Sequence, residues 1–216
     1  MCNHWDKRLR MKRLFTVKPY FLLFTAMTFS GSAALFLFNA ELLAKTDSGA
    51  MDRLFSKMGV IKVPPDDDPV KINLKDMNGN NISLSDFRGK IVFLNFWTTW
   101  CPTCRIEMPS MEKLHQKFKD GDFAMVTINL QESASEVKAF FKIFNLTFTA
   151  LLDSSGEVGT SFGILAIPTT YIIDKTGRII GRVSGPREWD SKASIALFEN
   201  LIDIDAMAAI SEATNR

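Results

Sequence analysis

The chain has 216 residues, 46% of them hydrophobic, which is enough for one ordinary domain and additional segments. Its net charge of +2 is unevenly distributed, because the first nineteen residues carry six basic side chains and one acidic one, a balance of +5 that leaves −3 for the rest. A mildly acidic body argues against a nucleic-acid-binding protein, which needs a basic face.

Residues 20–43 are predicted to form a transmembrane anchor. The stretch from Pro19 to Ala40 carries no charge, and a helix of that length spans roughly 30 Å, about one hydrocarbon core. Because the basic residues precede it, residues 1–19 are expected to be a cytoplasmic tail and everything after about Lys45 to lie outside the cytoplasm. A cleaved signal peptide is the alternative, but the apolar run is longer than a typical signal sequence and lacks a clean cleavage site.

The segment over residues 44–69 is predicted to join the anchor to the folded domain. Ser48 is a suitable cap for a short helix whose apolar side chains share one face: Met51, Leu54, Phe55 and Met58. This helix either lies on the membrane surface or continues the anchor, and the residues leave both possibilities open. From Val63 to Pro69, three prolines and three aspartates prevent regular structure, so this stretch is a linker.

Residues 70–216 have the pattern of one α/β domain. Two short strands flank a turn at Asn78-Gly79, and a continuous apolar run of strand length, a helix and a second buried strand follow. The three longer elements are expected to cover Lys90–Trp97, Pro102–Lys119 and Asp122–Leu130.

The second half of the domain continues this alternation. A helix over residues 133–145, capped by Ser133 or Ser135, precedes a third strand and a short helix. An antiparallel hairpin and a long last helix, capped by Asp190 or Ser191, complete the chain. These later elements are expected to cover Thr149–Asp153, Glu157–Phe162, Pro168–Asp174 paired with Arg178–Gly185, and the stretch to about Ala213. Alternating strands and helices that end in a hairpin predict an α/β sandwich with a mixed sheet.

Two of the three cysteines, Cys101 and Cys104, form a C-x-x-C motif directly after a buried strand and at the start of a helix. A helix N-terminus presents unpaired N–H groups and the positive end of the helix dipole, and Pro102 is a favoured first helical residue. The pKa of the Cys101 thiol is therefore expected to fall to about 3.5–7.5, while Cys104, one turn further, is shielded. Cys101 would attack a substrate disulfide, and Cys104 would resolve the mixed disulfide.

Two structural interpretations of the motif compete with this one. A zinc site needs two more ligands, and the chain offers only Cys2, His4 and His115, of which Cys2 is expected across the membrane. A passive structural disulfide is the second alternative, but a spacer of two residues closes so small a loop that it gains little chain entropy.

Two other thiol-containing classes require different patterns. A peroxiredoxin would have Pro-x-x-x-Thr-x-x-Cys; Thr98 and Cys101 fit this pattern, but Leu94 occupies the proline position. A copper-binding thioredoxin-like chaperone would have C-x-x-x-C and a distal histidine, and neither is present in the right form.

The segment WCPTC after NFW, with IPTTYIID some sixty residues later, resembles the thioredoxin superfamily. Together with the N-terminal anchor it is most similar to membrane-anchored TlpA/ResA-like thiol–disulfide oxidoreductases of bacteria, over roughly Val63 to Asp203. The resemblance implies a thioredoxin-like sandwich with a central mixed sheet and an extra central helix–strand insertion, here residues 133–145 and 149–153. It also implies a periplasmic domain tethered to the bacterial inner membrane, and a reductant role, often toward apocytochrome c or copper-delivery proteins.

The resemblance also implies a substrate-binding surface beside the cysteines. Ile167-Pro168 matches the family's cis-proline loop, which would expose the Ile167 backbone to pair with an extended substrate segment. An ordinary proline at a strand start is the alternative. Trp100 precedes the nucleophile and is expected to form an apolar surface that faces the substrate, together with Pro102. Trp97 is expected in the core.

Glu107 is the candidate proton carrier. Thioredoxin-like strands often place a buried Asp where this chain has Asn95, and the TlpA/ResA-like pattern suggests Glu107 as the replacement. At 100° per residue, Glu107 falls one turn from Cys104 within an apolar stripe that contains Met108, Met111, Leu114 and Phe118. A carboxylate rarely lies in a buried face without a role, although a Glu at the stripe's edge that reaches solvent is the alternative.

The sequence thus predicts a thiol–disulfide oxidoreductase, most simply a reductant, whose redox centre is the Cys101–Cys104 dithiol and which needs no dissociable cofactor and no metal. Its expected partners are a protein disulfide substrate and, by resemblance, a membrane thiol-reductase electron donor. A protein disulfide oxidant or isomerase is the alternative, because the reduction potential decides the direction and the sequence does not give it.

Overall fold

The computed structural model describes residues 49–64 and 68–214, with side chains in the last helix described up to residue 203. The predicted tail (1–19), anchor (20–43) and helix cap Ser48 lie outside this part of the chain. Within it, no helix is both long enough and apolar enough to cross a membrane. The transmembrane anchor therefore stays a prediction.

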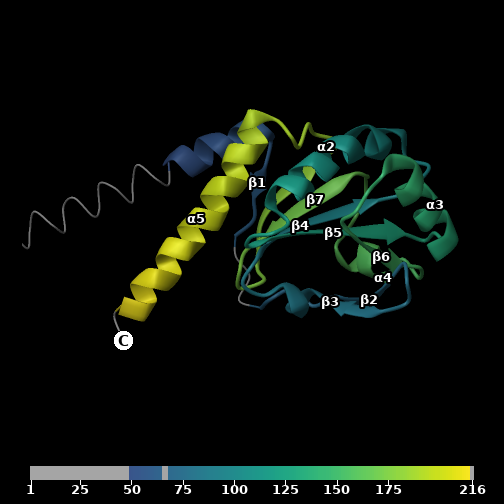
Figure 1. Cartoon of the computed structure of the whole chain (residues 1–216), viewed down its shortest axis with the longest axis horizontal. Helices are drawn as coiled ribbons and strands as arrows, with labels where there is room; N and C mark the ends of the chain where they lie inside the picture. The colour runs from purple at the N-terminus through teal and green to yellow at the C-terminus, as the bar shows by residue number, and fades with distance from the viewer. Residues whose placement is uncertain (1–48, 65–67, 215–216) are drawn as a thin grey trace, which may run out of the picture. The chain divides into compact units, whose positions relative to one another are not determined.

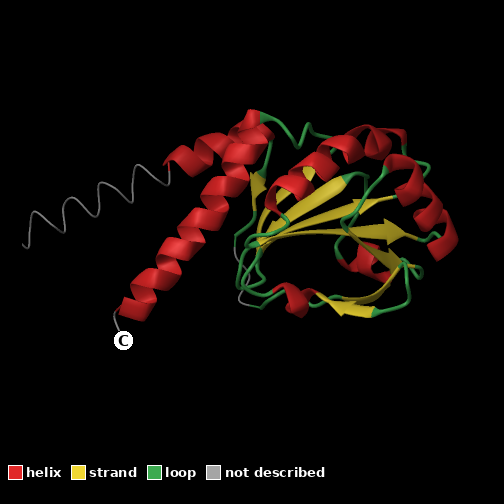
Figure 2. Ribbon diagram, viewed as in Figure 1, coloured by secondary structure: helices red, strands yellow, loops and turns green. Residues whose placement is uncertain are grey.

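The described residues form one mixed sheet of eight strands in the order β1-β8-β7-β4-β5-β6-β2-β3 (Figures 1 and 2). Strands β4, β5 and β6 are parallel, and the remaining neighbours pair antiparallel. Their bounds are β1 Ile61–Lys62, β2 Asn73–Asp76, β3 Asn81–Ser83, β4 Ile91–Trp97, β5 Phe123–Leu130, β6 Thr149–Asp153, β7 Thr169–Ile173 and β8 Ile179–Ser184. The mixed sheet and both predicted hairpins are confirmed.

Apart from one short 3-10 helix that was not predicted, the helices also follow the predicted order. They are a helix that covers residues 49–58, the 3-10 helix η1 (Leu84–Phe87), α2 (Pro102–Phe118), α3 (Ala134–Phe144), α4 (Glu157–Ser161) and α5 (Lys192–Thr214). Of the alternative caps, Ser133 closes a capping box with Glu136 at α3. At α5, the Ser191 hydroxyl accepts from the backbone N–H of Ser194 at 3.2 Å. Both caps satisfy donors that an uncapped helix start would leave unpaired.

Helices cover both faces of the sheet and build two apolar layers (Figure 1). Successive side chains of a strand point to opposite faces. In β4, Phe93 and Trp97 accordingly face α2, α3 and α5, while Leu94 and Phe96 face η1 and α4. Because every residue of β4 is buried, its continuous apolar run is that of a central strand. Asn95 lies on the same face as Phe93 and Trp97, toward α2.

The helix over residues 49–58 packs into the domain core. Phe55 and Met58 are buried, and Met51 and Leu54 are partly buried against the same cluster. After this helix, β1 extends the sheet by pairing with β8, where Lys62 lies opposite Gly181. A Cβ at Gly181 would come within 2.6 Å of Val60, so glycine permits this close approach. The apolar face predicted for this helix therefore packs into the core of the domain, although the helix precedes residue 70, where the domain was predicted to begin.

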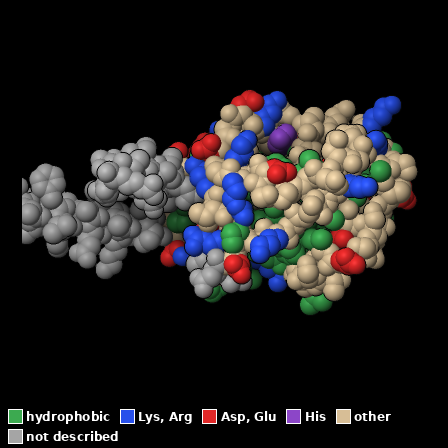
Figure 3. All heavy atoms as spheres, turned by 90° about the horizontal axis from the view of Figure 1, so that it is seen from below, with side chains coloured by type: hydrophobic (Ala, Val, Ile, Leu, Met, Phe, Trp, Pro, Cys, Tyr) green, Lys and Arg blue, Asp and Glu red, His purple; other side chains and the backbone are tan. Residues whose placement is uncertain are grey.

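Basic and acidic side chains are interspersed on the face of the molecule that Figure 3 shows. No continuous block of one sign forms on that face of the described residues, which agrees with the nearly balanced charge of the chain after its basic start. The surface shown offers no basic stripe of the kind that tracks a nucleic-acid backbone.

Candidate active site

Cys101 and Cys104 are joined in a disulfide where β4 passes into α2, with their Cα atoms 5.3 Å apart. Cys101 is the N-cap of α2, Pro102 is its first residue, and the backbone N–H of Cys104 points at the Cys101 sulfur at 3.2 Å. The predicted strand, C-x-x-C and helix arrangement is confirmed. A thiolate on Cys101 would lie at the positive end of the helix dipole, where unpaired N–H groups stabilise negative charge.

The two cysteines and their neighbouring tryptophans differ in exposure. Cys104 is fully buried and Cys101 is 3% exposed, whereas the Trp100 side chain is 68% exposed. Pro102 is exposed as well. Trp97 is fully buried against the rings of Phe140 and Phe141, as predicted for a core residue. In the chain, the exposed apolar ring of Trp100 therefore directly precedes Cys101, the more exposed of the two cysteines.

The loop that ends in Pro168 lies against the disulfide. The Ile167–Pro168 peptide bond is cis, as the family resemblance implied, and the Ile167 carbonyl oxygen lies 3.9 Å from the Cys101 sulfur. Beside it is a groove of about 450 Å³ whose walls include Trp100, Ile167 and the 95%-exposed Leu165. The structure thus brings together three of the predicted substrate contacts, Trp100, Ile167 and Pro168, around Cys101.

Glu107 is buried beneath the cysteines, with 1% of its surface exposed. One carboxylate oxygen accepts from Asn95 Nδ2 at 3.0 Å, and the other accepts from Trp189 Nε1 at 2.9 Å and the Arg187 backbone N–H at 3.2 Å. Burial raises the pKa of Glu107 from 4.5 to about 7, against the opposing effect of these donors, of which Trp189 contributes most. The alternative of a Glu at the edge of the stripe that reaches solvent is wrong for this residue. A carboxyl with a pKa near neutrality can both accept and return a proton.

Asn95 lies on β4 directly against Glu107. Its side-chain amide donates to Glu107 and to the Thr170 hydroxyl, both at 3.0 Å, and its own Oδ1 has no hydrogen-bond partner among the described residues. The amide on the strand and the carboxylate on the helix therefore share one buried site. The replacement of a strand acid by an acid on α2 stays a prediction about function.

Sequence reasoning missed two partners of Glu107, Arg187 and Trp189. Both lie in the segment between β8 and α5, some eighty residues after the C-x-x-C motif. Trp189 is fully buried and packs edge-on against Phe93 with ring centroids 4.7 Å apart. A tryptophan in a segment rich in polar residues and proline is a weak signal of such burial, and nothing in the sequence connects it to Glu107.

Metal-ligating side chains do not gather in the part of the chain that the structure describes: no three or more His, Cys, Asp or Glu lie close enough to hold an ion. His115 packs edge-on against Phe148. Cys2 and His4 lie outside the described residues.

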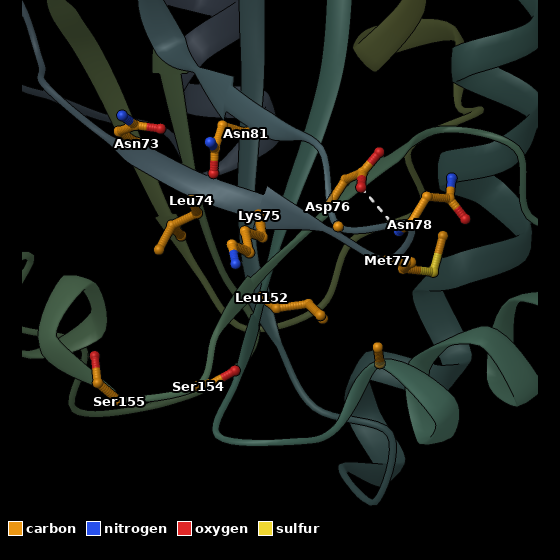
Figure 4. A pocket seen from close by; sticks show the side chains of 12 residues that line it. Asn73, Leu74, Lys75, Asp76, Met77, Asn78, Asn81, Leu152, Ser154 and Ser155 are labelled. Carbon is orange, nitrogen blue, oxygen red and sulfur yellow. Dashed lines mark hydrogen bonds between the residues drawn. The ribbon is translucent and has the colours of Figure 1, made fainter.

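A second groove, of about 750 Å³, lies away from the disulfide (Figure 4). Its lining comes from the β2–β3 hairpin and the end of β6, and it includes Lys75, Asp76 and Ser154. The Asp76 carboxylate accepts from the backbone N–H groups of Asn78 and Asn80, at 2.8 Å each, and so stabilises the hairpin turn. These contacts give the carboxylate a structural role, and no cysteine lines the groove.

The chain is similar in sequence to a known family and to known proteins. Residues 65–182 match the AhpC/TSA family. The chain is 40% identical over 110 residues to the thiol-disulfide oxidoreductase ResA of Bacillus thuringiensis subsp. konkukian, covering 51% of this chain and 64% of the relative. It is 36% identical over 112 residues to ResA of Bacillus subtilis, covering 52% and 63%. The chain thus spans just under two thirds of the length of the curated relatives it matches.

A solved structure with a similar fold is that of a secreted thiol-disulfide isomerase from Corynebacterium glutamicum. It superposes with a TM-score of 0.58 at 25% identity, over 67% of this chain and 92% of that one.

Proposed function

The chain belongs to the AhpC/TSA family, and within that family we propose that it is a thiol–disulfide oxidoreductase that acts on protein disulfides. The observation that carries the proposal is the Cys101–Cys104 disulfide at the N-terminus of α2, next to the cis Ile167–Pro168 bond. Relatives at 36–40% identity bear the same activity in their names. The fold alone would not support the proposal, because one fold hosts many functions.

The reaction begins from the reduced dithiol. The Cys101 thiolate attacks one sulfur of a substrate disulfide, a mixed disulfide forms, and the other substrate sulfur leaves as a thiolate and takes up a proton. Cys104 then gives its proton to Glu107 and attacks the Cys101 sulfur, which breaks the bond to the substrate, and the second substrate sulfur leaves as a thiolate that takes up a proton. Two electrons pass from the dithiol to the substrate, and Cys101–Cys104 becomes the disulfide seen here.

Glu107 is suited to the second step. Cys104 is fully buried, and burial in apolar surroundings disfavours a thiolate, so it needs a base close by. Glu107 follows one helical turn later, and its pKa of about 7 lets it accept a proton near neutral pH. Trp189, Arg187 and Asn95 hold the carboxylate in place through hydrogen bonds.

The substrate is proposed to bind as an extended segment across Trp100, Pro102 and the Ile167-Pro168 loop. Trp100 offers an exposed apolar ring, and the backbone of Ile167 lies beside Cys101. Backbone pairing would give affinity for substrates of many different sequences, while the groove beside Trp100 would select the side chain next to the substrate cysteine.

We further propose that the enzyme works as a reductant, tethered by residues 20–43 to the outer side of a bacterial cytoplasmic membrane. The charge-free stretch after a basic tail supports the tether. Electrons would then come from a membrane thiol reductase, because cytosolic reductants cannot reach Cys101, and the substrates would include proteins of cytochrome c or respiratory-complex maturation. No dissociable cofactor takes part.

A disulfide isomerase or oxidant is the second candidate function. The similar structure from Corynebacterium glutamicum, a secreted thiol-disulfide isomerase, favours it. The same dithiol serves either direction, and the reduction potential selects between them.

The activity is tested with the reduced full-length chain and insulin as a model protein disulfide. We expect the wild type to reduce insulin and the Cys101→Ser variant to be inactive. Cys2→Ser is the matched control, since it removes the third cysteine and should retain full activity. Turnover by Cys101→Ser, or none by the wild type, would contradict the proposal.

Topology is tested separately by a fusion of alkaline phosphatase after Arg216, since that enzyme matures outside the cytoplasm. We expect the fusion to be active in cells and a cytoplasmic reporter at the same position to be inactive. The opposite pair of results would refute the orientation without affecting the chemistry of the dithiol.

A further inference from the structure

Glu132 lies between β5 and α3, immediately before the Ser133 cap. Its carboxylate reaches across to the loop between β4 and α2. One oxygen accepts from the backbone N–H of Thr99 at 2.7 Å and from Asn129 Nδ2 at 2.6 Å, and the other accepts from the Thr99 hydroxyl. One side chain therefore ties the end of β5 to the loop that leads into the active site.

The loop that Glu132 holds carries the nucleophile. Thr99 stands two residues before Cys101, whose backbone N–H donates to the Thr98 carbonyl at 3.4 Å. Trp100, the residue between them, is 68% exposed and so gives the loop little anchorage. Asn129 is fully buried and lies opposite Trp97 in the β4–β5 register, so it fixes Glu132 to a rigid part of the sheet. Movement of Thr99 would displace both Trp100 and Cys101.

We propose that Glu132 is a positioning residue for the Cys101 nucleophile. It holds Thr99 so that the Cys101 sulfur stays at the N-terminus of α2, 3.9 Å from the Ile167 carbonyl oxygen. This role rests on the proposed function, because it matters only if Cys101 attacks a disulfide. Glu132 touches neither sulfur, and it acts through the loop.

A carboxylate suits this position better than an amide. Two of the groups that point at Glu132, the Thr99 N–H and the Asn129 Nδ2, can only donate, and both meet one oxygen, while the Thr99 hydroxyl donates to the other. An amide would keep its oxygen on the two N–H groups and turn its NH₂ toward the Thr99 hydroxyl, which would have to rotate and accept. Charge-assisted hydrogen bonds are also stronger than neutral ones. The Glu132→Gln substitution keeps the size of the side chain and loosens the contact with Thr99.

The chain offers a matched control in Glu112, which binds a threonine in the same way away from the site. Its carboxylate accepts from the backbone N–H of Thr147 at 2.8 Å and from the Thr147 hydroxyl at 2.6 Å. Glu112 follows Cys101 by eleven residues on α2, which is roughly 16 Å along a helix. Glu112→Gln therefore removes the same chemistry without touching the loop before Cys101.

The experiment compares wild type, Glu132→Gln and Glu112→Gln as full-length chains. Three quantities are measured: kcat/KM for insulin reduction, the pH midpoint of Cys101 alkylation, and the melting temperature. We expect Glu132→Gln to lower kcat/KM by about tenfold or more, as small misplacements of a reacting group do. The alkylation midpoint should rise, because the thiolate leaves its place at the helix N-terminus. Glu112→Gln should leave both quantities unchanged while the melting temperature falls by a similar amount.

The direction in which the pH midpoint of Cys101 alkylation shifts distinguishes a positioning role from a simple charge effect. Removing a negative charge near Cys101 would by itself favour the thiolate and lower the midpoint. A midpoint that falls or stays, or equal losses in both variants, would overturn the role of Glu132. If the wild type fails to reduce insulin, the proposed function fails instead, and the alkylation midpoints still report whether Glu132 positions Cys101.

Discussion

Replacing Glu107 by Gln should make the protein more stable at high pH and leave it unchanged at low pH. In the oxidised chain Glu107 is 1% exposed, and burial raises its pKa from 4.5 to about 7. The difference of about 2.5 between these pKa values corresponds to ~3 kcal/mol of folding free energy. That is the cost of keeping the ionised carboxylate in its buried site, and a neutral amide does not carry it.

The direction follows from proton binding. Below a pH of about 4.5 the carboxyl is protonated in both the folded and the unfolded chain, so it contributes no difference. Between 4.5 and about 7 the folded chain keeps the proton that the unfolded chain has lost, so stability falls as the pH rises. Above about 7 both forms are ionised and the loss is complete. The pH range in which the two proteins diverge is therefore 4.5 to 7.

The site can accommodate the amide. Gln at this position can offer its oxygen to Trp189 and to the Arg187 backbone N–H, which leaves its NH₂ toward Asn95. The Asn95 side chain can turn over, because its Oδ1 lacks a partner among the described residues and can then accept from that NH₂. The Thr170 hydroxyl, which now accepts from Asn95, would donate to it instead.

The assay is denaturant unfolding of oxidised wild type and Glu107→Gln at pH values from 4.5 to 8, so that neither active-site cysteine titrates. The difference in the free energy of unfolding should grow by ~3 kcal/mol across this range, in favour of the variant. All other titrating groups are common to both chains and cancel. A difference that is constant with pH would refute a buried carboxyl with a raised pKa, and with it the proton transfer assigned to Glu107.

The remaining predictions concern the reaction. Cys104→Ser should trap a mixed disulfide between Cys101 and a substrate, visible on a non-reducing gel, because the resolving thiol is gone; a trap through any other cysteine would reverse the assignment. Trp189→Phe removes a donor that lowers the pKa of Glu107, so the pKa of Glu107 should rise and the pH–rate profile for insulin reduction should shift to higher pH. Trp97→Phe is its control, since the Trp97 indole N–H has no partner among the described residues; equal profiles for both variants would show that Trp189 does not tune Glu107.

The central elements of the fold were predictable because local sequence determines them. Strands β4 and β5 are continuous apolar runs, and the C-x-x-C motif with Pro102 marks the start of α2. The outer strands were not placed, because their pairing is non-local: β2 joins β6 through contacts some 75 residues apart, and β1 joins β8 across about 120 residues. Neither pairing can be recognised from the local hydrophobic periodicity.

Some residues of the candidate site could likewise be predicted from local sequence, and others could not. Cys101 and Cys104 belong to a short motif, and the family resemblance implied the cis Ile167–Pro168 bond. The same resemblance suggested Glu107, and its place within an apolar helical stripe, where a charge is unusual, supported it independently. The groups that tune these residues escaped prediction. Trp189 comes from an irregular segment without periodicity, and its contact with Glu107 depends on how that segment returns to the sheet.

The same limit applies to Glu132. In the sequence it is one of several polar residues between a strand and a helix, and nothing there distinguishes it from Glu136, which takes part in the helix cap. Only the folded chain shows that its carboxylate crosses to Thr99. Contacts between loops depend on the geometry of the whole domain, so the structure is needed to identify them.

The reduction potential of the Cys101–Cys104 pair tests the central claim most directly. The full-length chain would be equilibrated against a series of dithiothreitol and glutathione buffers, and the reduced fraction measured by alkylation of the free thiols, with Cys2→Ser as background. A reductant should have a potential near that of thioredoxin, about −270 mV. A value near that of DsbA, about −120 mV, would contradict the account and identify the protein as an oxidant.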